Sequence, residues 1–161
     1  MTINDKIFGT LEYDYGWYKY TNINFLGENH EIALKISGEE DGVFSEEQYA
    51  AYKAFMEKWE ELQQELMPQI LDYYNRTRQE LGYEEMDDEE AEEEDYPPIH
   101  TTEELMEHVS IELLKVPYDH LSVDGREMGI VFGCTWDDEN GVGISLINEK
   151  IAEIGYQDVT F

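Results

Sequence analysis

Residues 45–82 read SEEQYAAYKAFMEKWEELQQELMPQILDYYNRTRQELG, and this stretch organises the rest of the chain. Apolar side chains recur along it in steps of three and four, which is the spacing of one face of an α-helix. Ser45 and Gln48 fit a capping box, in which both side chains satisfy free backbone groups at the helix start. Gly82 is a suitable C-cap, because glycine adopts the left-handed conformation at little cost. The pattern therefore predicts one long amphipathic segment between Ser45 and Gly82.

Pro68 lies inside this segment. Proline lacks the backbone N–H that a helix interior uses, and its ring clashes with the preceding turn. The sequence thus predicts either a helix that is kinked near Met67 or two helices that abut there.

Antiparallel strands are predicted before the helix. Apolar and polar residues alternate there with a period of two, between turn signals at residues 14–16 and 27–29. This alternation is typical of strands that are buried on one face. We expect a three-stranded meander over residues 6–13, 17–26 and 32–37.

The chain after the helix begins with an acidic segment, residues 84–98. Ten of the twelve residues 84–95 are acidic, and like charges at this density repel one another. We therefore expect a solvated loop here. A short helix over residues 101–108 should follow, with Thr101 and Glu104 as its capping box.

Segments in which apolar and polar residues alternate follow this short helix. They predict a second antiparallel meander. They cover residues 109–114, 128–136, 142–146 and 151–154, with a hairpin turn at Asp124-Gly125. The whole pattern predicts an α+β fold in a single domain of residues 1–161. In this fold an antiparallel meander is followed by the long helix, which covers an apolar face, and then by the second meander.

The net charge of the chain limits the classes of partner that we expect it to bind. Its 161 residues include 39 Asp and Glu but only 10 Lys and Arg, which gives a formal net charge of −29. This charge repels nucleic-acid phosphates and anionic membrane surfaces, so we expect neither as a partner. A strongly negative surface instead accelerates association with a basic protein.

Cysteine content and hydropathy predict a cytoplasmic location. The one cysteine, Cys134, allows no intrachain disulfide, which suits a reducing compartment. Residues 1–14 lack the basic and apolar regions of a signal peptide. No stretch approaches the roughly 18 apolar residues of a membrane span.

Most catalytic signatures are missing. The sequence holds no phosphate-binding glycine loop and no GxSxG nucleophile motif, and its four histidines are too scattered for a zinc site. Cys134 shares the parity of Phe132 and Trp136 in a predicted strand, which indicates a buried core residue. We therefore expect no enzyme activity, no cofactor and no metal.

Two groups of aromatic and acidic residues are candidate partner-binding patches. The first contains Tyr15, Trp17, Tyr18 and Tyr20, where aromatic residues occupy both faces of a predicted strand. Tyrosine and tryptophan are favoured in interface hot spots. The alternative is that a helix covers one side of the strand while the tyrosines half-cover the other.

The second patch contains Trp136, Asp137, Asp138 and Glu139, between two predicted strands. An aromatic ring beside three acids can anchor a basic surface. The alternative is an ordinary turn with Trp136 packed into the core.

The C-terminal region carries a resemblance. The stretch Gly129-Ile-Val-Phe-Gly-Cys-Thr-Trp136-Asp-Asp-Glu-Asn-Gly-Val-Gly-Ile144, with Ile154-Gly155 and Gln157-Asp158, resembles small acidic bacterial proteins of a family of unknown function. Some relatives of that family are suspected to be immunity proteins of toxin systems. Asn140 stands where the family pattern has a histidine, which weakens any site built on that position. The resemblance covers about the last 50 residues and implies a non-enzymatic bacterial cytosolic protein.

The sequence thus favours a binding protein that recognises a basic protein partner, for example an immunity protein that neutralises a basic toxin. One alternative is a structural or regulatory homo-oligomer. A second alternative is an enzyme that uses carboxylates or a divalent metal, which requires acids that converge in a pocket.

Overall fold

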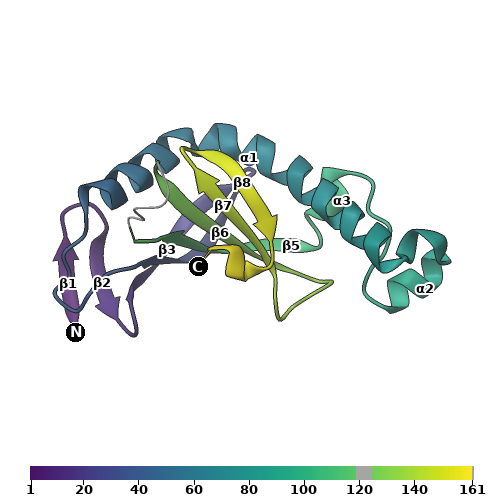
Figure 1. The fold of residues 1–161 in the computed structure, drawn as a ribbon, viewed down its shortest axis with the longest axis horizontal. Helices are drawn as coiled ribbons and strands as arrows, with labels where there is room; N and C mark the ends of the chain where they lie inside the picture. Colours follow the sequence, from purple (N-terminus) through teal and green to yellow (C-terminus); the bar gives the residue numbers. More distant parts are fainter. Residues whose placement is uncertain (119–124, 161) are drawn as a thin grey trace.

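One long helix lies across one face of a twisted sheet in the structure, a computed structural model that describes residues 1–118 and 125–160 (Figure 1). The strands are β1 Thr2–Asp5, β2 Gly9–Tyr13, β3 Trp17–Phe25, β4 Glu28–Ile36, β5 Val109–Val116, β6 Glu127–Cys134, β7 Val142–Ile147 and β8 Lys150–Gly155. The helices are α1 Glu46–Leu81, α2 Asp88–Glu93 and α3 Thr102–Leu105, with 3-10 turns η1 Tyr83–Glu85 and η2 Gln157–Thr160. The predicted α+β class is confirmed.

Within these described residues, the eight strands form one sheet in the order of the sequence, β1 to β8. Neighbouring strands are antiparallel except β4 and β5, which are parallel, with Leu34 opposite Leu114. The two predicted meanders are therefore confirmed, and a crossover through α1 joins them into one sheet. The first meander has an additional edge strand, β1, which the alternation pattern did not indicate. The predicted hairpin turn at Asp124 lies outside the described residues.

Helix α1 begins and ends where the sequence predicts. The Ser45 hydroxyl accepts a hydrogen bond from the Gln48 backbone at 3.2 Å, and the Ser45 backbone donates to the Gln48 side chain at 3.0 Å. Gly82 ends the helix at φ 83°. The helix continues through Pro68, so the alternative of two abutting helices is wrong. Pro68 is on the exposed side, where water can bond the carbonyl that lacks a donor, and the helix bows over the sheet (Figure 1).

Replacing Ser45 with alanine should lower the free energy of unfolding by about 1 kcal/mol, because the Gln48 N–H loses its acceptor at the helix start. Urea denaturation followed by circular dichroism at 222 nm measures this loss. Ser45→Asp is the control, since aspartate also caps helices and should retain most of the stability. Equal losses in the two variants would contradict a capping role.

The core lies between α1 and the sheet. The ring of Phe25 in β3 packs against Trp59 of α1 and Phe132 of β6, with centroid distances of 5.9 and 5.5 Å. The indole N–H of Trp59 also donates to the Asn24 carbonyl at 2.6 Å. These contacts attach the helix to both meanders, so the domain has one continuous core.

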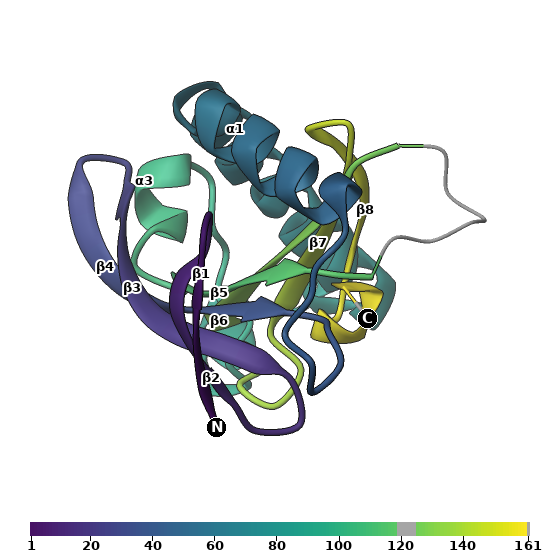
Figure 2. The same cartoon turned by 90° about the vertical axis from the view of Figure 1, so that its left-hand side faces the viewer.

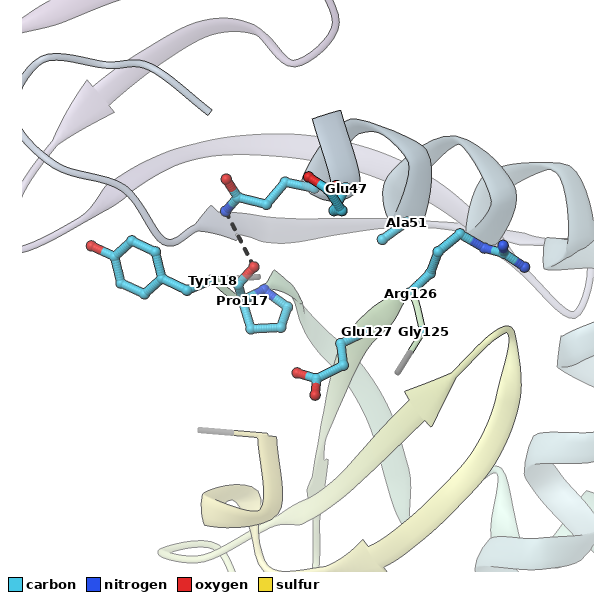
Figure 3. A pocket seen from close by; sticks show the side chains of 8 residues that line it. Glu47, Ala51, Pro117, Tyr118, Gly125, Arg126 and Glu127 are labelled. Carbon is cyan, nitrogen blue, oxygen red and sulfur yellow. Dashed lines mark hydrogen bonds between the residues drawn. The ribbon is translucent and has the colours of Figure 1, made fainter. Parts of the chain in front are cut away.

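Gln48 fixes the crossover between the two meanders. Its side-chain NH₂ donates to the Ser37 carbonyl at 2.7 Å and to the Pro117 carbonyl at 3.2 Å, just beyond the ends of β4 and β5. Figure 3 shows Pro117 and Tyr118 below the first turn of α1, with the bond to the Pro117 carbonyl dashed. The crevice there has about 10 Å³, space for roughly one water molecule. The hydrogen bonds of Gln48 hold the two meanders together here, and the crevice is too small to be a ligand site.

The acidic segment differs from the predicted loop. Residues 88–93 form helix α2, and the Asp87 carboxylate caps it by accepting from the Glu89 N–H at 3.0 Å. The positive end of the helix dipole stabilises the acidic residues of the first turn. The side chain of Ala91 is fully buried. The loop prediction is therefore wrong for residues 88–93. The next predicted helix is shorter than expected, and its Thr101 cap is present.

Turn η2 packs on the face of the sheet opposite α1 (Figure 2). Along β7, Val142 and Ile144 face the core, so Gly143 between them faces the other side. At Gly129, Gly143 and Gly155, an added Cβ atom would lie within 3.0 Å of residues 156–160. The absence of side chains at these positions lets the C-terminal residues lie directly on the strand backbones.

Candidate functional site

The first predicted patch is divided between core and surface. Tyr15 is fully exposed at a tight turn with φ 58°, and Tyr20 is 69% exposed. Trp17 is completely buried, and its indole N–H donates to the Glu39 carbonyl at 2.7 Å. Tyr18 is half-buried, and its hydroxyl donates to the Glu12 carboxylate at 3.0 Å, which raises the pKa of Tyr18. Trp17 thus belongs to the core beneath the patch, and Tyr15, Tyr18 and Tyr20 form its surface.

Two lysines and one aspartate line the cavity beside the first patch. Tyr15, Trp17 and Tyr18 help to line a cavity of about 320 Å³, and its charged lining residues are Asp14, Lys35 and Lys115. The register of the parallel pair places these two lysines opposite each other, and burial together with the Lys35 charge lowers the pKa of Lys115 to about 8. This environment disfavours a basic group, so the first patch is the weaker candidate for a basic partner.

The second predicted patch surrounds the turn between β6 and β7. Trp136 is packed into the core, as its alternative interpretation proposed, whereas Asp138 and Glu139 are exposed. The Asp137 carboxylate accepts hydrogen bonds from the Asn140 backbone at 3.1 Å and from the Asn140 side chain at 3.0 Å. The fold therefore holds Asp137 in a fixed position at the edge of Trp136.

A cavity of about 320 Å³ opens beside this turn, and we call it the tyrosine pocket. Aromatic and acidic side chains converge on it from α1, from the segment after α2, from the β6–β7 turn and from the end of β8. Its lining residues are Tyr73, Thr77, Glu80, Leu81, Tyr96, Trp136, Asp137, Gly141, Gly155 and Tyr156. The second patch thus contributes Trp136 and Asp137 to a larger site.

A series of aromatic rings connects the tyrosine pocket to the acidic segment. The ring of Tyr74 lies 4.4 Å from Trp136 and 6.2 Å from Tyr96, and Tyr96 stacks on Tyr83 at 4.6 Å. The Tyr74 hydroxyl donates to the Pro97 carbonyl at 2.5 Å. Since Tyr83 and Tyr96 flank residues 84–95, these contacts anchor both ends of the acidic segment, and Tyr96 anchors one end at the pocket.

The tyrosine pocket is partly shielded from water and is lined by two acidic side chains. Burial raises the pKa of Tyr73, and the nearby Tyr156 adds to this effect. Burial also raises the pKa of Tyr96, with contributions from Asp137 and Tyr156. Tyr73 and Tyr96 therefore remain neutral near pH 7, and the side chains of Asp137 and Glu80 line the same pocket. Carboxyl groups beside neutral aromatic rings are chemically suited to a cation.

Sequence reasoning did not identify Tyr73, Tyr96 and Tyr156 as site residues. Tyr73 belongs to the apolar stripe of α1, and Tyr96 follows the acidic segment. Nothing in local periodicity indicates that these segments meet the β6–β7 turn. The available signal was the clustering of tyrosines next to acids.

A third cavity, of about 290 Å³, lies near the start of β5. Its lining includes Glu107, His108, Glu112 and Asp138. Among the described residues that line it there is no tyrosine, tryptophan or phenylalanine ring to pack against a ligand. In residues 1–118 and 125–160, no group of three or more His, Cys, Asp or Glu side chains is placed to hold a metal ion. The tyrosine pocket remains the better-formed candidate.

Cys134 should be unreactive in the folded protein. It is 8% exposed, and its thiol donates to the Asp137 carbonyl at 3.3 Å. Burial raises the pKa of Cys134 to about 11, so only about one molecule in a thousand is a thiolate at pH 8. Labelling with Ellman's reagent at pH 8 should be slow in native protein and rapid in about 6 M guanidinium chloride. Rapid stoichiometric labelling of the native protein would contradict this prediction.

Comparisons with known proteins identify the family of the chain. Searches of curated proteins and of solved structures found no match. No helix in the described residues has the length and apolar character needed to cross a membrane. The model of one family, described as "Domain of unknown function (DUF6985)", matches residues 7–161, well beyond the C-terminal region of the sequence resemblance. The chain therefore belongs to the DUF6985 family of domains of unknown function.

Proposed function

We propose that this chain is a non-enzymatic cytosolic protein that binds a basic protein partner. The observation that carries the proposal is the tyrosine pocket beside the acidic segment. The fold brings Asp137 and Glu80 together with three tyrosines, next to ten further acids. Aromatic rings and carboxylates in a half-closed cavity are suited to recognition of a basic surface.

Long-range charge supports the same proposal. The net charge of −29 creates a negative potential that attracts basic partners and accelerates their association. All five acids of helix α2 are exposed, and the stacking of Tyr83 on Tyr96 holds the two ends of the segment that contains α2 together near the pocket. About a third of the net charge therefore lies in the segment that leads to the pocket.

An immunity or inhibitor role is the specific form of this proposal. Nucleases and similar toxins have basic clefts that bind phosphates, and an acidic protein can block such a cleft without any chemistry. The sequence resemblance is to a family of unknown function, some relatives of which are suspected immunity proteins, and this motivates the step. The partner would then be a basic toxin encoded by the same bacterium.

The test is capture of a basic partner from host lysate by the immobilised full chain. Capture should be strong at about 50 mM salt and at least about tenfold weaker at 500 mM, because salt screens exposed charges. Two variants with equal charge changes control for net charge. One replaces Asp88, Glu89, Glu92 and Glu93 with amides, and the other replaces Glu57, Glu60, Glu61 and Glu65 with glutamine.

Weaker capture by the α2 variant than by the α1 variant would support a binding surface near the tyrosine pocket. An empty eluate at low salt, or capture of acidic proteins only, would overturn the proposed function. Light scattering of the chain alone measures self-association under the same conditions.

A further inference from the structure

We infer that the tyrosine pocket binds an arginine side chain of the basic partner, an inference that rests on the proposed function. The pocket combines carboxylates for the guanidinium charge with aromatic rings for its planar faces. This specifies which chemical group the partner inserts, and where.

The carboxylates provide directional acceptors. The hydrogen bonds from Asn140 hold the Asp137 carboxylate in one orientation without using all of its lone pairs. Glu80 is exposed on the last turns of α1 and also lines the pocket. A guanidinium group between these residues can form charge-assisted hydrogen bonds, which are stronger than neutral ones.

The aromatic rings favour arginine over lysine. Tyr73 and Tyr156 line the cavity, and the stacking of Tyr96 on Tyr83 at 4.6 Å fixes a third ring. A guanidinium is planar and weakly hydrated, so it stacks on such rings and leaves water readily, whereas an ammonium is strongly hydrated. Rings that are held in place beforehand also reduce the entropy lost on binding.

The tyrosine pocket is large enough for one arginine side chain. Its volume of about 320 Å³ is at the lower end of the range for small-molecule sites, roughly 300–1,000 Å³. The cavity beside the first patch has a similar volume, but its lining has two lysines, Lys35 and Lys115, against one carboxylate, Asp14, which makes it less favourable for a cation. Of the three cavities described above, the tyrosine pocket is the one that combines carboxylates with tyrosine rings, so it is the one suited to arginine.

The test uses the ¹⁵N-labelled full chain titrated with the peptide acetyl-Gly-Arg-Gly-amide, followed by NMR. Amide shifts should concentrate at residues that line the pocket, including Gly141, Gly155 and Tyr156. The same peptide with citrulline, which is neutral and nearly isosteric, should bind at least about tenfold more weakly. The lysine peptide should also bind more weakly than the arginine peptide.

Variants at exposed positions test the site without disturbing the core. Glu80→Gln and Tyr156→Leu should each weaken arginine-peptide binding about threefold. Glu57→Gln is the matched control, because it removes the same charge from an exposed position of α1 far from the pocket. Shifts spread evenly over the acidic surface, or equal weakening by Glu80→Gln and Glu57→Gln, would overturn the inference.

The two proposals fail in different ways. If the captured partner binds the Glu80→Gln/Tyr156→Leu double variant as tightly as the unaltered chain, the arginine pocket is wrong and the binding function stands. If the arginine peptide binds as expected but no basic protein is captured, the pocket stands and the proposed function is wrong.

Discussion

Replacing Gly143 with alanine is expected to lower the free energy of unfolding by about 3 kcal/mol. The added Cβ would lie 2.5 Å from the Tyr156 carbonyl oxygen and 2.8 Å from the Gln157 Cα. Both atoms belong to the backbone, so no side-chain rotation relieves the contact. Either η2 leaves the sheet or β7 shifts within the core.

Urea denaturation of the full chain measures the effect of Gly143→Ala. Gly155→Ala is the matched control, because its Cβ meets only a Val159 side-chain methyl at 2.9 Å, which can rotate away. We expect the control to lose no more than about 1 kcal/mol. In a chain that ends at Gly155, the cost of Gly143→Ala should fall sharply. An unchanged cost in that shortened chain would show that contact with residues 156–160 is not its cause.

The second large effect is expected at Gln48. This side chain is 5% exposed, accepts from the Ser45 N–H, and donates to the carbonyls of Ser37 and Pro117. Gln48→Glu has nearly the same shape, but an ionised carboxylate has no hydrogen to donate and repels both carbonyl oxygens. We expect a loss of about 4 kcal/mol at pH 7, because the substitution leaves buried acceptors unpaired and buries a charge.

The pH dependence of the stability of Gln48→Glu shows whether the loss comes from the charge of the new side chain or from its shape. Burial and the two carbonyls should raise the pKa of the new carboxyl in the folded state above its unfolded value of about 4.3. Stability is then greatest below that unfolded pKa, where the neutral carboxyl donates a hydrogen bond, and it falls as the pH rises through the folded pKa. The deficit relative to the unaltered chain should therefore be smaller at pH 4 than at pH 7.

Urea unfolding at the two pH values measures this deficit. Gln48→Ala is the control, since its deficit should be the same at pH 4 and pH 7. A Gln48→Glu deficit that does not change with pH would contradict the role assigned to the side-chain NH₂ group.

Local signals were sufficient to predict most of the architecture. Ser45 and Gly82 cap the two ends of α1. These ends could be predicted because capping depends on a few adjacent residues. Strand β1 was missed because Thr2–Asp5 is short, and it forms a strand only by pairing with β2, with Ile3 opposite Leu11. The acidic segment was predicted as a loop because charge repulsion dominates its composition. The Asp87 cap and the burial of Ala91 against the rest of the domain offset that repulsion.

Tertiary contacts explain what the sequence could not predict about the site. Periodicity places Trp136 and Tyr73 on apolar faces, but it does not bring those faces together. Tyr96 reaches the tyrosine pocket because Tyr74 and Arg78 bond the chain near Pro97. The pocket is thus formed by four segments far apart in sequence, and only the turn that carries Asp137 could be identified beforehand.

The sequential strand order has a consequence for how the chain reaches its native state. Each antiparallel pair joins neighbouring segments, so its contacts form early and at little cost in chain entropy. The β4–β5 ladder, in contrast, brings Leu34 to Leu114 across the whole helical crossover. We expect this ladder to form late and to limit the folding rate. The two meanders would then behave as separate cooperative units in hydrogen exchange until α1 and Gln48 join them.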